Sequence, residues 1–387
     1  MRRIFRTTLR ALVVLAVLAL AAGLWKREEI ARLMAVNTLF EADRIVANFS
    51  TMNRAFLNVP VPRGDGPVSP LPQGPVADLP PEVEAWITDR SVTALIVLKD
   101  GEIRHESYHL GTGADDRRIS WSVAKSYLSA LLGTLVADGT IPDLDAPVTR
   151  YAPGLIGSAY DGASIRNVLQ MASGVDFDED YLDYESDINR MGREIALGGT
   201  LDGFTAGLTA RARDPGSAWQ YVSMDTHVIG MVIRGATGRD IPSLLSERII
   251  APLGLEAEPY YLTDGEGVAF VLGGLNMTTR DYARFAQMIA QDGVWQGNRI
   301  LPQGWVGEST APSAPTAPGA IGYGYQWWVP VGAGPGQFMA RGIYGQYLYI
   351  DQPRGVVIAT HGADRGFRED GVDDANIAMF RLIAESL

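Results

Sequence analysis

A serine and a lysine three residues apart, Ser122 and Lys125, are the residues of this chain whose types and spacing most directly suggest chemistry. Apolar residues recur around them at three- and four-residue spacing, which predicts a helix with one buried face. In the first turns of such a helix the two polar side chains lie on nearly the same side, at the positive end of the helix dipole. A hydroxyl beside an amine becomes a nucleophile if the amine has lost its proton.

Lysine is rare in this chain, which makes Lys125 conspicuous. Of the 33 Lys and Arg residues only three are lysines, the others being Lys26 and Lys99, so the rest of the positive charge is arginine. An arginine does not deprotonate in a protein, whereas a lysine removed from water falls well below its usual pKa of roughly 10.4. The alternative is a chance Ser-x-x-Lys pair on a solvated helix, which the apolar, uncharged surroundings argue against.

The composition is that of a globular protein and argues against several function classes. A chain of 387 residues, 47% hydrophobic and 20% charged, suits one large domain or two closely packed ones. A net charge of −12 argues against nucleic-acid binding, which needs a basic face. Without cysteine there is no disulfide, thiol nucleophile or thiolate ligand. The four histidines do not exclude a metal site, but none has a metal-binding spacing, and we expect no cofactor.

Residues 1–25 have the pattern of a signal peptide or a signal anchor. Four arginines precede an uncharged run at residues 11–25, namely Arg2, Arg3, Arg6 and Arg10. The run is shorter than the roughly 20 residues of a usual spanning helix, although residues 7–9 extend it. An Ala-x-Ala cleavage site at residues 19–21 lies inside the run, so we favour retention. This predicts an exported body anchored to the membrane; soluble export after cleavage is the alternative.

Residues 26–80 are expected to connect this segment to the main domain. Residues 26–57 mix apolar and charged residues in a way that predicts an amphipathic helical stalk. Residues 59–81 hold eight prolines, which is typical of an extended linker or of a strap along the surface. We place the catalytic domain at residues 81–387.

The main domain has strand patterns at both ends and helical patterns between them. Strands are predicted at residues 92–98, 103–110, 324–329, 337–350 and 355–360. Residues 140–270 form a mostly helical insert, a capped helix runs from Thr278 to about residue 291, and a last helix occupies residues 373–387. We therefore expect an α+β fold in which N- and C-terminal segments share one antiparallel sheet flanked by helices.

Two further segments could take part in chemistry. Tyr221 follows a Pro/Gly turn and precedes an apolar helix, a position from which a hydroxyl can point into a cleft. Taken alone, it is most often a packing residue. Residues 340–346 contain two glycines inside a predicted strand, and glycine there commonly marks the close approach of a ligand or of another backbone. An ordinary bulge or edge is the alternative.

Together these segments resemble the serine hydrolases of the β-lactamase and penicillin-binding superfamily, and most closely its branch of 6-aminohexanoate-dimer hydrolases and related esterases. The resemblance covers roughly residues 92–363. It rests on Ser-Val-Ala-Lys at 122–125, Tyr-x-Ser at 221–223 and Ala-x-Gly-Ile-x-Gly-Gln at 340–346. It implies the β-lactamase-like version of the α+β fold that the strand pattern predicts.

The resemblance also implies a role for each residue. Ser122 would be the nucleophile, Lys125 the amine that accepts its proton, and Tyr221 the relay to the leaving group. The backbone N–H groups of Ser122 and Ile343 would hold the oxyanion, a pair of donors worth a few kcal/mol in the transition state. The substrate-binding residues would be Gly342 and Tyr181.

Two departures from the family pattern bear on the substrate. Ser223 stands where penicillin-recognising enzymes usually carry asparagine, and Ala340 where they carry a lysine or histidine that binds the β-lactam carboxylate. We therefore predict hydrolysis of small-molecule amides or esters through an acyl-enzyme, rather than efficient β-lactam turnover. The alternatives are a penicillin-binding D,D-peptidase or β-lactamase, and a catalytically silent relative that binds ligands.

Overall fold

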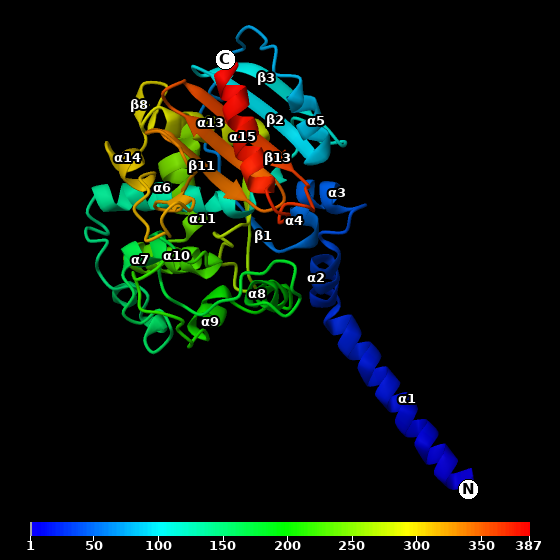
Figure 1. The fold of residues 1–387 in the computed structure, drawn as a ribbon. Helices are drawn as coiled ribbons and strands as arrows, with labels where there is room; N and C mark the ends of the chain where they lie inside the picture. The colour runs from blue at the N-terminus through cyan, green and yellow to red at the C-terminus, as the bar shows by residue number, and fades with distance from the viewer. Residues whose placement is uncertain (1) are drawn as a thin grey trace.

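A seven-stranded antiparallel sheet lies at the centre of the protein, with strands in the order β3-β2-β13-β12-β11-β10-β9 (Figure 1). The computed structural model describes residues 2–387, with side chains from Phe5 onward, so the side chains of Arg2 and Arg3 lie outside the described part. The strands are β2 (Val92–Lys99), β3 (Glu102–Tyr108), β9 (Gly322–Tyr323), β10 (Trp328–Val329), β11 (Gln337–Gly342), β12 (Gln346–Asp351) and β13 (Val356–Gly362).

Strands from the two ends of the chain pair with each other at the middle of this sheet. β2 runs antiparallel to β13, with Ile96 opposite Ala359 and Leu98 opposite Val357. Both strands are buried almost throughout, which explains why their sequences are continuous apolar runs. The expected α+β class, with one antiparallel sheet made from N- and C-terminal segments, is confirmed.

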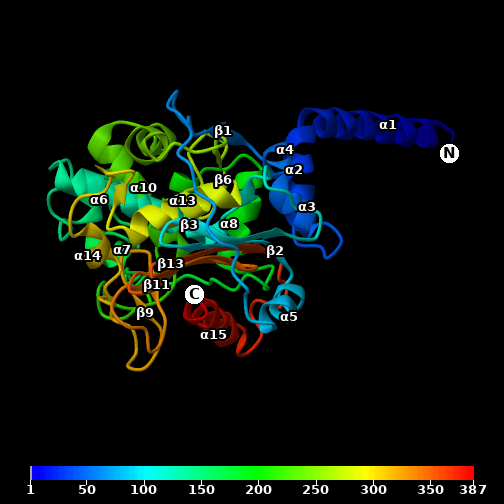
Figure 2. The same cartoon turned by 90° about the horizontal axis from the view of Figure 1, so that it is seen from above.

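Helices cover both faces of the sheet (Figure 2). Trp86 and Phe380, from two helices on one face, contact each other edge to face. Along β2, Leu95 belongs to the core on that face and Ile96 to the larger core on the other, as the alternation of a strand requires. The helices are α5 (Glu82–Asp89) and α15 (Val372–Glu385) on the first face, and α6 (Ala124–Ala137) and α13 (Thr279–Ala290) on the second.

Two segments that were predicted as single strands contain turns. The segment 337–350 divides into β11 and β12, because Tyr344 and Gly345 adopt positive φ angles of 61° and 91° and turn the chain. In the segment 324–329 the chain turns at Gln326, which has φ of 66°, and only Trp328 and Val329 form a strand, which pairs with β9 just before the segment. The pattern of apolar residues continues through both turns, so it did not reveal them.

The predicted insert is mostly helical and lies beyond one end of the sheet (Figure 1). Its helices are α7 (Ile165–Leu169), α8 (Asp187–Ala196), α9 (Leu201–Ala206), α10 (Ser223–Thr237), α11 (Ile241–Leu245) and α12 (Ala251–Leu253), with a π-turn η4 (Ser246–Ile250) and 3₁₀ turns η2 (Val148–Arg150) and η3 (Pro153–Leu155). A small sheet in the order β1-β5-β6-β4 joins the insert to the N-terminal segment. It consists of β1 (Asn58–Pro60), β4 (Arg118–Ile119), β5 (Tyr260–Leu262) and β6 (Leu275–Met277). A two-stranded ribbon of β7 (Val294–Trp295) and β8 (Asn298–Arg299) and the short helix α14 (Trp305–Ser309) follow α13.

The N-terminal helix α1 (Arg2–Trp25) extends away from the body (Figure 1). Its segment Phe5–Trp25 is 21 residues long and apolar enough to cross a membrane, and none of it is buried in the protein. This segment extends beyond the uncharged run of residues 11–25 and includes Arg6 and Arg10 near its N-terminal end. A signal sequence has the same properties, so the helix by itself indicates either an anchor or a signal.

Residues 26–57 form helices as expected, but they pack against the body instead of extending from it as a free stalk. Phe49 and Ile45 are at most 2% exposed, and β1 pairs with β5. The proline-rich part runs along the surface as a strap, bonded for instance through the Gly74 N–H to the Ile103 carbonyl. The helices of this part are α2 (Arg27–Thr38), α3 (Ile45–Ser50) and α4 (Met52–Ala55).

Candidate active site

Ser122 lies in a single 3₁₀ turn, η1 (Trp121–Val123), directly before α6. The sequence placed it in the first turn of the α-helix itself, so the helix begins two residues later than predicted. The preceding residue, Trp121, has a positive φ of 44°, a strained conformation for a bulky residue that is found mostly at functional sites. This sharp bend presents the Ser122 side chain at the start of α6.

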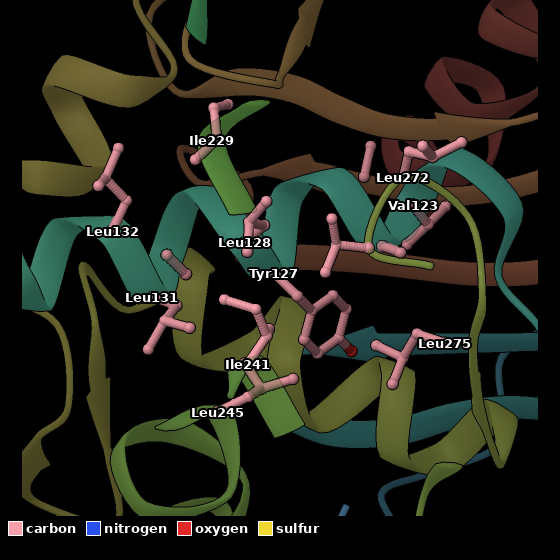
Figure 3. Packing of buried hydrophobic residues seen from close by; sticks show 14 of the residues in the cluster. Val123, Tyr127, Leu128, Leu131, Leu132, Ile229, Ile241, Leu245, Leu272 and Leu275 are labelled. Atoms are coloured by element: carbon pink, nitrogen blue, oxygen red, sulfur yellow. The ribbon is translucent and has the colours of Figure 1, made fainter. Parts of the chain in front are cut away.

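The helix α6 is buried on nearly every side, which fixes the position of Ser122. Tyr127 stacks on Phe285 at 3.6 Å between ring centroids, and Leu128 and Leu131 are at most 1% exposed. Figure 3 shows these side chains packed against residues from the insert and from β6, including Leu275. The predicted buried face therefore exists, and the burial extends well beyond that face.

Lys125 is enclosed among these apolar groups, with 1% of its surface exposed. Its Nζ donates hydrogen bonds to the Leu272 carbonyl oxygen at 2.6 Å and to Ser223 Oγ at 3.2 Å. Burial lowers the pKa of this amine to about 7, although the charges of Glu179 and Asp225 act in the opposite direction. A neutral amine that uses two N–H bonds in this way keeps its lone pair for a third partner.

Tyr221 lies beside both residues. Lys125 Nζ is 5.5 Å from the centroid of the Tyr221 ring, and Ser122 and Tyr221 line the same cavity of about 640 Å³. Burial raises the pKa of the Tyr221 phenol, and the Glu179 charge adds to the rise, while hydrogen bonds with Ser122 and Ser223 oppose it. The phenol is therefore protonated at neutral pH, as a proton donor must be.

The turn after β11 approaches the Ser122 backbone closely. A Cβ atom on Gly342 would lie 2.6 Å from the Ser120 carbonyl oxygen and 3.1 Å from the Ser122 nitrogen, so only glycine fits there. Among the described residues, neither the Ser122 nor the Ile343 backbone N–H donates to a protein acceptor. Both residues line the 640 Å³ cavity, so the two N–H donors are left for a ligand.

Glu179 is a charged residue of this site that the sequence analysis did not single out. Its carboxylate accepts hydrogen bonds from the Ser223 N–H at 2.8 Å, from the Ser223 hydroxyl and from the Tyr181 hydroxyl. Burial raises its pKa, which the Lys125 charge and the Ser223 bonds oppose. One of several acidic residues in a loop offered no distinguishing signal, because such residues are usually solvated.

Arg341 was also overlooked as a site residue. Ala340 is fully buried, and Arg341, the next residue along the strand, lines the cavity instead. Its guanidinium bonds to Asp373 at 2.6 Å and lies 5.2 Å from the Trp328 ring centroid. The site therefore does contain a cation, which is partly neutralised by Asp373. The alternation of strand side chains could have indicated it.

Ser122 also lines a second cavity, which we call the larger one because more residues form its wall. Ser122, Tyr181 and Ile343 belong to the walls of both cavities, so the two spaces meet at the serine. The larger one lies between α2, α4 and α8 and is bounded mostly by aliphatic and aromatic side chains. The structure thus brings all six residues proposed from the sequence to one place, together with Glu179 and Arg341.

Comparison with known proteins gives this arrangement a family. The model described as Beta-lactamase matches residues 83–379. The 6-aminohexanoate-dimer hydrolase of Paenarthrobacter ureafaciens is 34% identical over 285 residues, which cover 70% of this chain and 72% of that protein. The chain belongs to the β-lactamase family. The resemblance found in the sequence, including the branch within the family, is confirmed.

Solved structures of the β-lactamase family share the fold. A candidate 6-aminohexanoate-dimer hydrolase from Bacillus anthracis has a TM-score of 0.78 at 22% identity, over 90% of this chain and 95% of that one. A family VIII carboxylesterase has a TM-score of 0.60 at 16% identity, over 81% of this chain and 99% of that one. The β-lactamase-like fold is thus confirmed, and the protein is a hydrolase of this family.

Proposed function

We propose that this protein cleaves amide or ester bonds of small molecules through an acyl-enzyme on Ser122. The observation that carries the proposal is the buried Lys125 amine, whose pKa of about 7 leaves much of it neutral at physiological pH. It lies one turn after a serine that shares a cavity with Tyr221. A base with a pKa near the working pH both accepts a proton and gives it back.

The first half-reaction acylates the serine. Ser122 Oγ bonds to the substrate carbonyl carbon while its proton passes to Lys125 Nζ. The backbone N–H groups of Ser122 and Ile343 receive the negative charge on the carbonyl oxygen. The C–O or C–N bond then breaks, and the leaving group takes a proton from the Tyr221 hydroxyl. Tyr221 regains a proton from the Lys125 ammonium, which leaves an ester of Ser122 and a neutral amine.

The second half-reaction releases the acyl group. Water adds to the ester carbonyl as Tyr221 and Lys125 together take up one of its protons, and the same N–H groups hold the oxyanion. The bond between the carbonyl carbon and Ser122 Oγ breaks, and Ser122 receives the proton. The products are a carboxylic acid and the enzyme in its starting state.

Hydrolysis of a nitrophenyl ester tests the proposal. We expect Ser122→Ala and Lys125→Arg to abolish turnover, because arginine is too basic to accept the serine proton. Lys99→Arg makes the same exchange in the β2–β3 hairpin and should retain activity. Near-normal activity of Lys125→Arg would mean that the amine is not the base. No turnover of activated esters and amides, together with no fluorophosphonate labelling of Ser122, would favour a silent ligand-binding relative.

Arg341 gives one observation in favour of the penicillin-binding alternative. A cation on the cavity wall is suited to the carboxylate that a β-lactam carries, although Asp373 already occupies part of its hydrogen-bonding capacity. Incubation with a fluorescent penicillin distinguishes a penicillin-binding enzyme from the proposed amide or ester hydrolase. Firm labelling that disappears in Ser122→Ala would identify a D,D-peptidase or β-lactamase, whereas we expect weak labelling or none.

We also infer that α1 is retained as a membrane anchor and that the catalytic body faces the periplasm or the cell exterior. Support comes from the length of the apolar segment, 21 residues, which fits the roughly 20 that a spanning helix needs. The alternative is a soluble exported protein after cleavage of a signal peptide.

A further inference from the structure

The two cavities that meet at Ser122 have different chemistry. The smaller one combines the charged side chains of Glu179, Arg341 and Arg368 with aromatic rings such as that of Trp328. In the larger one the side chains from α8 form an apolar stripe, with Ile188, Met191 and Ile195 on its surface. An ester or amide bond at Ser122 would therefore have the cavity with the charged, more polar wall on one side and the apolar cavity on the other.

Two polar side chains on the wall of the larger cavity, Arg32 and Asn189, make hydrogen bonds to the protein. Arg32 Nε donates to the Ala196 carbonyl oxygen at 2.9 Å, which ties α2 to the end of α8. Asn189 Nδ2 donates to the carbonyl oxygens of Tyr181 at 3.0 Å and Asp183 at 2.7 Å. The rest of this wall is mainly hydrocarbon surface, which binds an alkyl chain through the hydrophobic effect.

The positions of the catalytic groups decide which part of a substrate lies on each side. Tyr221, the proposed proton donor to the leaving group, lines the smaller cavity and not the larger one. The leaving group must lie within reach of that hydroxyl, so it occupies the polar cavity near Arg341. The acyl group then points the other way, into the apolar cavity.

We propose that the substrates are esters or amides of medium- to long-chain fatty acids, whose alkyl chain occupies the cavity between α2, α4 and α8. This inference rests on the proposed function and adds the identity of the acyl group. The polar leaving group lies beside Arg341 and Arg368, so the substrate as a whole is an amphiphile.

The N-terminal segment places this cavity near a lipid surface. The helix α2 follows α1 after one residue and lies between α1 and α8 (Figure 1). It has 12 residues, so at about 1.5 Å per residue it spans roughly 18 Å. Ile30 and Met34 on α2 are 43% and 63% exposed, which leaves apolar groups on the side of the cavity wall that faces away from the protein. With α1 in a bilayer, amphiphiles in that bilayer lie close to the cavity.

Gly192 offers a way to block the cavity without disturbing its frame. It lies in α8, on the cavity wall, and a Cβ atom there would meet nothing within 4 Å. Its φ is not positive, and alanine favours a helix over glycine, so a side chain is compatible with the backbone. Gly192→Phe fills the space with a ring, and Gly192→Ala is the matched control that leaves it open.

The experiment compares nitrophenyl butyrate and nitrophenyl laurate as substrates of the full chain in nanodiscs. We expect the wild type and Gly192→Ala to prefer laurate by about tenfold or more in kcat/KM, because each added methylene leaves water. In Gly192→Phe that preference should fall by about tenfold. Partition of laurate into lipid is the same for all three proteins, so the difference between variants reports on the cavity.

Three outcomes would contradict the inference in distinguishable ways. If the wild type used both esters equally, or if Gly192→Phe lost activity on both equally, the alkyl chain of the substrate would not bind in this cavity. The proposed hydrolase function would not be affected by either result. Failure of the wild type to hydrolyse either ester would contradict the proposed function itself. If thermal unfolding shows that Gly192→Phe is not folded, Gly192→Leu takes its place in the same comparison.

Discussion

The Lys125 amine donates a hydrogen bond to the Ser223 hydroxyl across 3.2 Å. Ser223 in turn donates to Glu179, so the amine is linked through one hydroxyl to a carboxylate. Burial of the amine lowers the pKa of Lys125, and the negative charge of Glu179 raises it. Burial is the larger effect, so the pKa is about 7. Ser223, at the position where penicillin-recognising enzymes usually carry asparagine, thereby connects the proposed base to a carboxylate that raises its proton affinity.

The proton affinity of Lys125 predicts the pH dependence of hydrolysis. Activity requires the neutral amine, and the neutral form is lost as the pH falls through the pKa of about 7. We therefore expect kcat/KM to rise with pH and to level off above about 7, which initial rates of ester hydrolysis between acid and weakly alkaline pH would measure. A profile that is flat across neutral pH would mean that a group other than Lys125 is the base.

Replacement of Glu179 tests the electrostatic part of this account. Glu179→Gln removes a negative charge that raises the pKa of Lys125, so the acid limb of the profile should move to lower pH. Glutamine retains an oxygen that can accept from Ser223. Asp373→Asn, which removes a carboxylate next to Arg341, is the comparison, and it should leave the limb near its original pH. A shift to higher pH in Glu179→Gln would contradict the assignment.

The role of Tyr221 predicts a dependence on the leaving group. Tyr221→Phe removes the proton donor, so hydrolysis of an amide or alkyl ester should fall by roughly 10² to 10⁴. A nitrophenyl ester releases a stable anion and should be affected much less. Parallel kcat measurements on a nitrophenyl ester and an alkyl ester of the same acid check this. An equal loss on both substrates would indicate that the ring only supports the structure of the site.

The close approach of Gly342 to Ser122 predicts that a side chain at this position lowers kcat by disturbing the proposed oxyanion site. A Cβ atom at this position would lie 2.6 Å from the Ser120 carbonyl oxygen, so Gly342→Ala pushes the turn away from Ser122. Loss of one well-placed N–H donor lowers kcat by roughly 10² to 10³, and we expect a fall of that size. Gly334→Ala, before the other end of β11, would meet no atom closer than 3.6 Å and should have little effect. Similar kcat values for the two variants would argue against Ile343 as a donor.

The proposed reacting groups were easier to find in the sequence than the residues that surround them. Short sequence motifs identify Ser122, Lys125 and Tyr221. Continuous apolar runs identify the central strands. Glu179 and Arg341 lack such a pattern, because their function depends on contacts made across the fold with Ser223 and with the cavity. No local rule joins Glu179 to a serine 44 residues away.

Turns and long-range packing explain the other differences between the predicted and the observed structure. The hairpin of β11 and β12 depends on Tyr344 at a positive φ, a conformation that tyrosine rarely adopts and that composition did not suggest. The helices of residues 26–57 were recognised from their apolar residues, but the same pattern fits a free stalk and a segment packed on a neighbour. Contacts with distant parts of the chain, such as that of Phe49 with Trp121, distinguish the two.

Retention of α1 predicts a membrane-bound protein with an intact N-terminus. After expression of the full chain, we expect the protein in the membrane fraction, resistant to high salt and alkaline wash and released by detergent. Mass spectrometry of the purified protein should find residues 1–25 still attached. A protein that begins just after Ala21 and fractionates with soluble material would identify a cleaved signal peptide instead.

The packing of Phe49 predicts that the N-terminal segment is part of the catalytic body. Phe49 is fully buried, its ring meets the Trp121 ring edge to face at 5.5 Å, and Trp121 holds the bend before Ser122. Phe49→Ala should lower the free energy of unfolding by about 3–5 kcal/mol, since a large buried ring leaves a cavity. Met34→Ala, on the exposed side of α2, should change it by roughly 0.5 kcal/mol or less. Chemical denaturation in detergent, followed by tryptophan fluorescence, measures both. A Phe49→Ala value no larger than that of Met34→Ala would show that the segment is held only weakly. A reduced kcat in a folded Phe49→Ala protein would show that the same contact also positions Ser122.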